Sequence, residues 1–95
     1  MDIQTIRQKT LPIFKQYRVR KAAVFGSVAR GENYPASDVD ILVEMPEKSR
    51  LFDVLALQID LEALLGRPVD LVEYEAIRER LKPYILRDQM SIFTA

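Results

Sequence analysis

The sequence predicts an α/β or α+β fold in which a small mixed β-sheet is packed by helices. Two observations lead to this prediction. Segments whose apolar residues recur at helical spacing alternate with short segments rich in β-branched residues, and no segment repeats another. The 95 residues are enough for a single domain, 1–95, with one compact core. The 48% hydrophobic and 29% charged residues are typical of a globular protein.

The first third of the chain predicts a helix, a strand and a helical turn. Between residue 2 and about residue 17, apolar residues recur every three to five positions, which indicates a helix that Pro12 kinks or divides. Val19–Phe25 is rich in β-branched and aromatic residues and stops at Gly26-Ser27, as expected of a strand that enters a turn. Residues 28–31 suit one helical turn, and residues 32–37 are turn-forming.

The next predicted strand, residues 38–45, alternates between two faces. One face carries Val39, Ile41 and Val43. The other face carries Asp38, Asp40, Leu42 and Glu44. The two aspartates therefore share one face and lie roughly 6–7 Å apart along the strand.

The remaining residues predict two helices and one strand. Ser49 is a suitable cap for a long amphipathic helix that ends at Gly66. Residues 69–73 read as a third strand, and residues 75–87 as a final helix, kinked at Pro83, that covers the sheet. The stretch 89–93 is apolar enough to be a partner-binding or dimer edge and short enough to be terminal packing.

The composition excludes several classes of function. Lysine and arginine total 14 and aspartate and glutamate total 14, so the chain lacks the positive field expected of a protein that binds long nucleic acid. The absence of cysteine and histidine excludes disulfides, thiolate chemistry, the usual zinc ligands and histidine bases. Any catalysis must depend on carboxylates, hydroxyls, cations and metal. With no leader-like segment and no run of eighteen apolar residues, we expect a soluble cytoplasmic protein that has no membrane partner.

The paired aspartates predict a magnesium site. Mg²⁺ prefers oxygen ligands and usually takes a few carboxylates together with phosphate oxygens and water. Asp38 and Asp40 can chelate one ion or bridge two, and a third carboxylate from a neighbouring strand would complete a two-metal site. Asp70 is the candidate, because an aspartate inside an apolar strand is costly to bury unless its charge is compensated. The alternative is that Asp70 lies in water at a strand end or pairs with a lysine or arginine.

Gly26-Ser27 predicts a phosphate-binding turn. Glycine permits close backbone approach, and the amides of the following helical turn, with the serine hydroxyl, can hold a polyphosphate. Arg30 can neutralise phosphate charge from the same turn. The alternatives are a plain strand-to-helix turn and a solvated surface arginine.

These residues carry a family resemblance. The segments 26–32 (GSVARGE) and 37–43 (SDVDILV) resemble the signature of the minimal nucleotidyltransferases, the MNT branch of the DNA polymerase beta-like superfamily. The segment 66–72 (GRPVDLV) is similar to the later family segment that holds a third aspartate, and the resemblance covers essentially the whole chain. It implies a nucleotidyltransferase fold, with Gly26 and Ser27 on the triphosphate of ATP and Asp38, Asp40 and Asp70 on two Mg²⁺ ions.

The resemblance also implies an activity and a partner. Members of this size commonly act as the antitoxin of a HEPN-domain ribonuclease toxin, and some silence it by transferring AMP from ATP to a toxin tyrosine. So short a chain has little room for a separate acceptor-binding domain, which favours an acceptor on another chain and leaves a homo- or hetero-oligomer open. Two alternatives remain: a non-catalytic module that neutralises its partner by complex formation, and a small-molecule nucleotidyltransferase.

Overall fold

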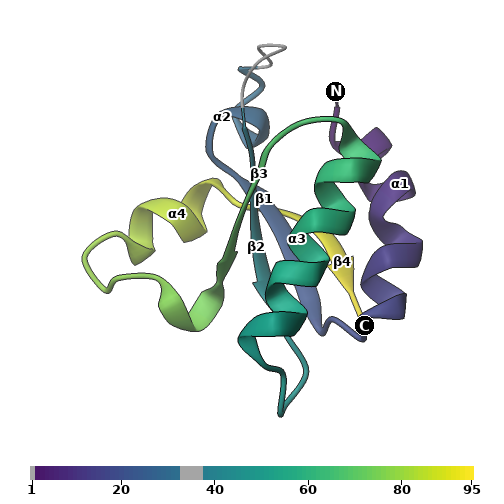
Figure 1. Ribbon diagram of the computed structural model, residues 1–95. Coiled ribbons are helices and arrows are strands. Elements are labelled where there is room, and N and C mark those ends of the chain that lie inside the picture. Colours follow the sequence, from purple (N-terminus) through teal and green to yellow (C-terminus); the bar gives the residue numbers. More distant parts are fainter. Residues whose placement is uncertain (1, 33–37) are drawn as a thin grey trace.

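The computed structural model describes residues 2–32 and 38–95 and confirms a mixed fold of helices and a four-stranded sheet. Most of the predicted turn 32–37 lies outside the described residues. In chain order the elements are α1 (Ile3–Gln16), β1 (Lys21–Phe25), α2 (Gly26–Ala29), β2 (Val39–Glu44), α3 (Leu51–Leu65), β3 (Val69–Glu73), the 3₁₀ turn η1 (Tyr74–Ala76), α4 (Lys82–Asp88) and β4 (Met90–Thr94) (Figure 1).

The sheet has the strand order β3-β2-β1-β4. Strands β2 and β3 are parallel, and α3 forms the crossover between them, as a parallel pair requires. Strand β1 runs antiparallel to both of its neighbours, β2 and β4. The register places Asp40 beside Asp70 on one side and beside Phe25 on the other. The sheet is therefore mixed, as the sequence predicts.

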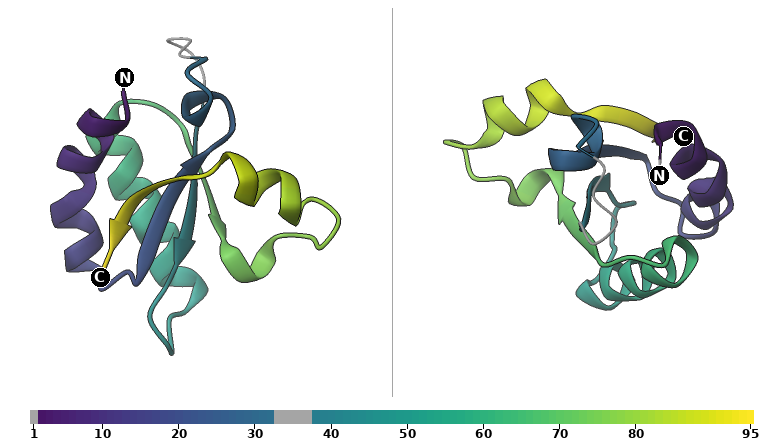
Figure 2. Two further views of the ribbon diagram at one scale, coloured as in Figure 1. Left: turned by 180° about the vertical axis from the view of Figure 1, so that it is seen from behind. Right: turned by 90° about the horizontal axis from the view of Figure 1, so that it is seen from above.

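Helices cover both faces of the sheet. The larger core packs α1 and α3 against one face of the sheet (Figure 2), and it includes Val39, Ile41 and Val43. The smaller core, on the opposite face, joins Ala23 and Leu42 of the sheet to residues of η1, α4 and the segment between them. The alternation predicted for β2 is correct. Because Asp40 has the same parity as Leu42, it lies on the face covered by α4.

Helix α1 is a single helix, so the prediction that Pro12 divides it is wrong. Pro12 lacks the N–H that would bond to the carbonyl of Gln8. Both residues are exposed, so water can take the place of that bond. The helix begins at Asp2, whose carboxylate accepts a hydrogen bond of 2.7 Å from the Thr5 N–H.

Several predicted boundaries shift by one or two residues, and β2 spans Val39–Glu44 instead of residues 38–45, so that Asp38 directly precedes it. Strand β1 begins at Lys21 and not at Val19, because Arg18 adopts a φ of 57° and Val19 remains bonded to the carbonyl of Phe14 at the end of α1. Helix α3 is capped by Arg50 and not by Ser49, whose hydroxyl donates instead to the carbonyl of Pro46. Gly66 ends α3 in the left-handed conformation, as predicted.

The C-terminal third differs most from the prediction. The expected kinked helix over residues 75–87 is wrong, since η1 is followed by a separate short helix, α4. Pro83 lies in the first turn of α4, where a missing N–H costs nothing. The stretch 89–93 forms most of β4, an edge strand paired with β1. Arg7 of α1 donates two hydrogen bonds, of 3.0 and 2.8 Å, to the carbonyl of Ser91 in this strand.

Within the described residues, no helix has both the length and the apolar character needed to cross a lipid bilayer.

Candidate active site

The predicted phosphate turn lies where β1 passes directly into α2. Gly26 is the first residue of α2, two residues earlier than the sequence predicts. Its φ of +71° belongs to the left-handed region, and a Cβ at this position would overlap the carboxylate of Asp40. Glycine is required here on both counts. Its absent side chain is what allows the Asp40 carboxylate to lie against the turn.

The first turn of α2 presents backbone donors beside that carboxylate. The N–H groups at the start of a helix have no partner within the helix, so those of Gly26, Ser27 and Val28 are available to an anion. The carbonyls of Gly26 and Ser27 are already bonded, to the N–H groups of Arg30 and Glu32. The turn therefore presents N–H donors in its first residues, while its carbonyl acceptors are used in hydrogen bonds to residues that follow in the chain.

Asp40 is the centre of the acidic group. It is partly buried on β2, and its register partner Asp70 projects from β3 on the same face. Burial raises the pKa of the Asp40 carboxyl above its ordinary value, and the nearby charges of Asp70 and Asp38 raise that pKa further. Arg30 acts in the opposite direction. All three predicted aspartates therefore interact electrostatically at one end of the sheet, beside the Gly26 turn.

Asp38 and Asp70 are both exposed. The burial argument for Asp70 is therefore wrong, because β3 is an edge strand and its aspartate is exposed to solvent. What brings Asp70 to the site is its register with Asp40. That register depends on how β2 and β3 pair, which residue spacing alone does not reveal.

The donor set suits a hard divalent cation. The charges of Asp38 and Asp70 raise the pKa of Asp40, and a bound cation would offset this repulsion between the three carboxylates. Carboxylate oxygens are also the ligands that Mg²⁺ prefers. Among the described residues, however, no three carboxylates are arranged so that they could hold a metal ion as they stand. A metal ion held by all three carboxylates would therefore require them to reorient, for example when a ligand brings its own oxygens.

Arg30 follows α2 and reaches toward the site from its rim. Its guanidinium lies 3.4 Å from Glu32 and 3.9 Å from Asp88 of α4, and about half of its side chain is exposed. Glu32 and then Asp88 raise the pKa of Arg30, so the residue stays charged. Sequence reasoning missed Asp88, which lies 58 residues from Arg30 and one position beyond the helix predicted for residues 75–87.

A family model described as a nucleotidyltransferase domain matches residues 7–93, which include all six predicted site residues. The chain belongs to the nucleotidyltransferase domain family. The resemblance recognised in the sequence is thereby confirmed, and Gly26, Ser27 and the three aspartates lie together in a fold of this family.

Two relatives match nearly the whole chain. A proposed protein adenylyltransferase of Methanocaldococcus jannaschii is 40% identical over 92 residues, covering 97% of this chain and 99% of the relative. The protein adenylyltransferase MntA of Thermococcus cleftensis is 42% identical over 87 residues, covering 92% of this chain and 86% of the relative.

Solved structures share the fold. A proposed minimal nucleotidyltransferase matches with a TM-score of 0.81 and 38% identity over 95% of each chain. A chain in the complex of a tri-AMPylated HEPN toxin of Shewanella oneidensis with an MNT antitoxin matches with a TM-score of 0.74 and 18% identity, over 98% of this chain and 73% of that one. At that identity the second likeness concerns the fold alone.

Proposed function

We propose that this nucleotidyltransferase transfers AMP from ATP to a hydroxyl of a partner protein. The observation that carries the proposal is the contact between the phosphate turn and the acidic group. The Asp40 carboxylate lies against Gly26, at the head of a turn with free backbone donors, and beside Asp70. Phosphate donors and carboxylates next to each other are what a nucleoside triphosphate carrying a divalent cation would need.

The turn would hold the triphosphate. The N–H groups of Gly26 and Ser27 donate to phosphate oxygens, and the Ser27 hydroxyl adds a further donor. Arg30 is already charged and half exposed, so it can move from Glu32 and Asp88 to the phosphates without leaving water. These contacts fix the α-phosphate for attack along the line of its bond to the leaving pyrophosphate.

Asp38, Asp40 and Asp70 would hold Mg²⁺, with two ions as the expected number. When bound, the metal would neutralise charge on the phosphates and favour ionisation of the attacking hydroxyl. For this the carboxylates must be ionised, so the raised pKa of Asp40 matters to activity at low pH. The acceptor hydroxyl attacks the α-phosphate, the bond to the pyrophosphate breaks, and Asp70 takes the hydroxyl proton.

The acceptor would be a tyrosine of a HEPN-domain toxin, with this cytoplasmic chain as the antitoxin. The support is the name protein adenylyltransferase carried by the T. cleftensis relative and the presence of the same fold in a complex with an AMPylated HEPN toxin.

A second candidate is a module that neutralises the toxin by binding alone. It is favoured by the absence, among the described residues, of three carboxylates already placed to hold a metal. The two functions separate in cells: a triple Asp38, Asp40 and Asp70 alanine variant protects against the toxin only if binding suffices.

The direct test mixes the protein with labelled ATP, Mg²⁺ and a HEPN-domain partner protein. Label should pass to the toxin and stop when a chelator removes Mg²⁺. Asp40→Ala should reduce transfer by roughly 10²–10³-fold, the loss typical of removing one preorganised electrostatic group. Glu44→Ala is the matched control, since Glu44 lies on the same face of β2 at the opposite end of the strand. No transfer by the wild type, or equal transfer by the Asp40 and Glu44 variants, would refute the proposal.

A further inference from the structure

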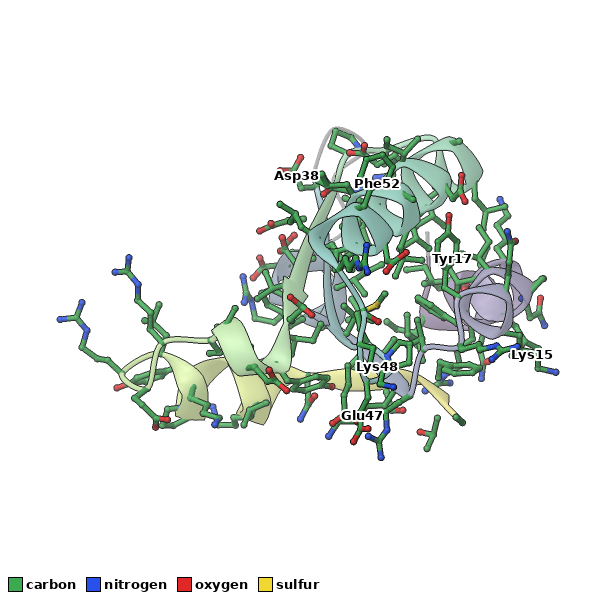
Figure 3. The ribbon with its side chains drawn as sticks, turned by 60° about the horizontal axis from the view of Figure 1, so that its bottom comes forward. Lys15, Tyr17, Asp38, Glu47, Lys48 and Phe52 are labelled. Carbon is green, nitrogen blue, oxygen red and sulfur yellow. The ribbon has the colours of Figure 1, made fainter. Side chains whose placement is uncertain are left out.

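The outward face of α3 is apolar. Phe52 is 83% exposed, Leu51 73%, Ile59 65% and Leu55 49% (Figure 3 labels Phe52). These positions lie on the side of the helix opposite Leu57 and Leu61, which are fully buried in the core. Four large apolar side chains, each exposed by about half or more, form a contiguous stripe of the kind that marks an interaction site.

The polar residues of α3 do not make this stripe less apolar, because the side chain of each forms a hydrogen bond within the protein. The Asp53 carboxylate accepts from the Arg50 N–H at 2.9 Å, and Asp60 accepts from the hydroxyl of Tyr17. Figure 3 labels Tyr17. Gln58 donates to the Val69 carbonyl at 3.0 Å, and Glu62 accepts from the Val69 N–H at 2.9 Å. The stripe is thus left with methyl, methylene and aromatic groups alone.

The stripe is close to the β3 edge of the sheet. The bonds from Gln58 and Glu62 to Val69 hold α3 along this edge strand, and Asp70 is the next residue of the strand. The active-site carboxylates lie on the opposite face of the sheet from α3. A protein seated on α3 therefore needs only to pass around β3 to bring a side chain to Asp70 and Asp40.

The charges beside the stripe indicate which kind of partner fits. Helix α3 has three carboxylates and no lysine or arginine. Asp53 and Asp60 border the stripe on one side, and Glu62 lies in line with it near the C-terminal end of the helix. Pairing α3 antiparallel with a second copy of itself would set the two carboxylate-bearing sides against each other. A helix whose apolar stripe is bordered by lysine and arginine would instead meet complementary charge at Asp53 and Asp60.

We infer that this stripe, formed by Leu51, Phe52, Leu55 and Ile59, is the docking surface for the protein acceptor, which presents an amphipathic helix with cationic flanks. The inference rests on the proposed function, to which it adds the place where the acceptor binds. Apolar contact holds the acceptor on α3, and its attachment at the β3 edge positions the acceptor hydroxyl next to the site.

The test measures binding and transfer separately. The probe is the HEPN-domain protein used in the transfer assay, and the Kd of its complex with this chain is measured by calorimetry without ATP. Phe52→Glu and Leu55→Glu should each weaken binding by about 30-fold or more, the loss expected at a binding hot spot. Leu11→Glu is the matched control, since Leu11 is a helix-surface leucine of similar exposure, 42%, on α1. Binding should also weaken as NaCl is raised from low to high concentration.

The outcomes are distinct. Loss of binding in the α3 variants, with binding kept in Leu11→Glu, supports the stripe as the docking surface. If the wild type binds in this way but transfers no AMP, only the proposed catalytic function is refuted. Equal binding by all variants, with transfer intact, overturns the surface and leaves the function standing. If the wild type is a dimer that Phe52→Glu converts to a monomer, the occupant of the surface is a second copy of this chain. If binding is insensitive to salt, the partner helix does not carry the proposed cationic flanks. Either result refutes the inference. No binding by the wild type refutes both proposals.

Discussion

Replacing Gly26 with alanine separates the two demands that the structure makes of this residue. A side chain in the left-handed region costs about 1–2 kcal/mol. Gly66 has nearly the same φ, +67° against +71°, but among the described residues a Cβ at Gly66 would meet nothing within 4 Å, whereas one at Gly26 would overlap the Asp40 carboxylate. Gly66→Ala therefore carries only the backbone cost, and Gly26→Ala carries the same cost together with displacement of Asp40.

Both variants should lower the free energy of unfolding by about 1 kcal/mol or more, which for a domain of this size lowers Tm by roughly 4–8 °C per kcal/mol. Only Gly26→Ala should impair chemistry. Moving a catalytic carboxylate by about 1 Å costs on the order of 10²-fold in rate, so AMP transfer should fall by at least that much. Thermal unfolding and transfer of labelled AMP, measured on both variants, check the two effects. Equal transfer rates would show that the contact between Gly26 and Asp40 is not part of the active site.

Three further predictions concern other contacts. Asp40→Asn should abolish transfer and yet raise the Tm of the ligand-free protein at pH 7: the folded state raises the pKa of Asp40, so its ionisation costs stability as pH rises, and the gain should vanish below the ordinary pKa of 3.8. Tyr17→Phe should lower the free energy of unfolding in urea at pH 7 by about 1 kcal/mol, because it removes the hydrogen bond to Asp60. That bond raises the pKa of Tyr17 to about 12, so the stability that it adds should be complete below pH 10 and lost as pH rises toward 12. A Tyr17 phenol that titrates near pH 10 would contradict this. Arg30→Gln should raise the KM for ATP severalfold while leaving Tm within a degree or two, since its ion pairs are exposed; an unchanged KM would remove Arg30 from the phosphate site.

Local patterns in the sequence predicted most of the fold. The alternation of β2 and the stop of α3 at Gly66 depend on residues a few positions apart, which is why both are correct. Strand β4 was missed although Ile92, Phe93 and Thr94 favour strands, because its partner, β1, lies about 70 residues away and only that pairing makes the short segment a strand. Pro83 was read as interrupting a helix when it begins one, because proline is compatible with either position and only the tertiary fold decides.

The site was predictable as a set of residues but not as an arrangement. The family motifs identify Gly26, Asp40 and Asp70 individually. The contact between Gly26 and Asp40, and the register that sets Asp40 beside Asp70, arise from strand pairing that no spacing in the sequence encodes. The exposure of Asp70 has the same origin, because an apolar run does not reveal whether its strand lies at the centre or the edge of a sheet.

Side chains occupy some backbone groups at both edges of the sheet. On β3, Gln58 and Glu62 occupy the carbonyl and N–H of Val69, and on β4, Arg7 occupies the carbonyl of Ser91. An open edge strand is a template for aggregation, and these bonds remove backbone groups on which another strand could grow. At these positions the protein can therefore expose an apolar helix to a partner without also offering a strand that would seed fibrils.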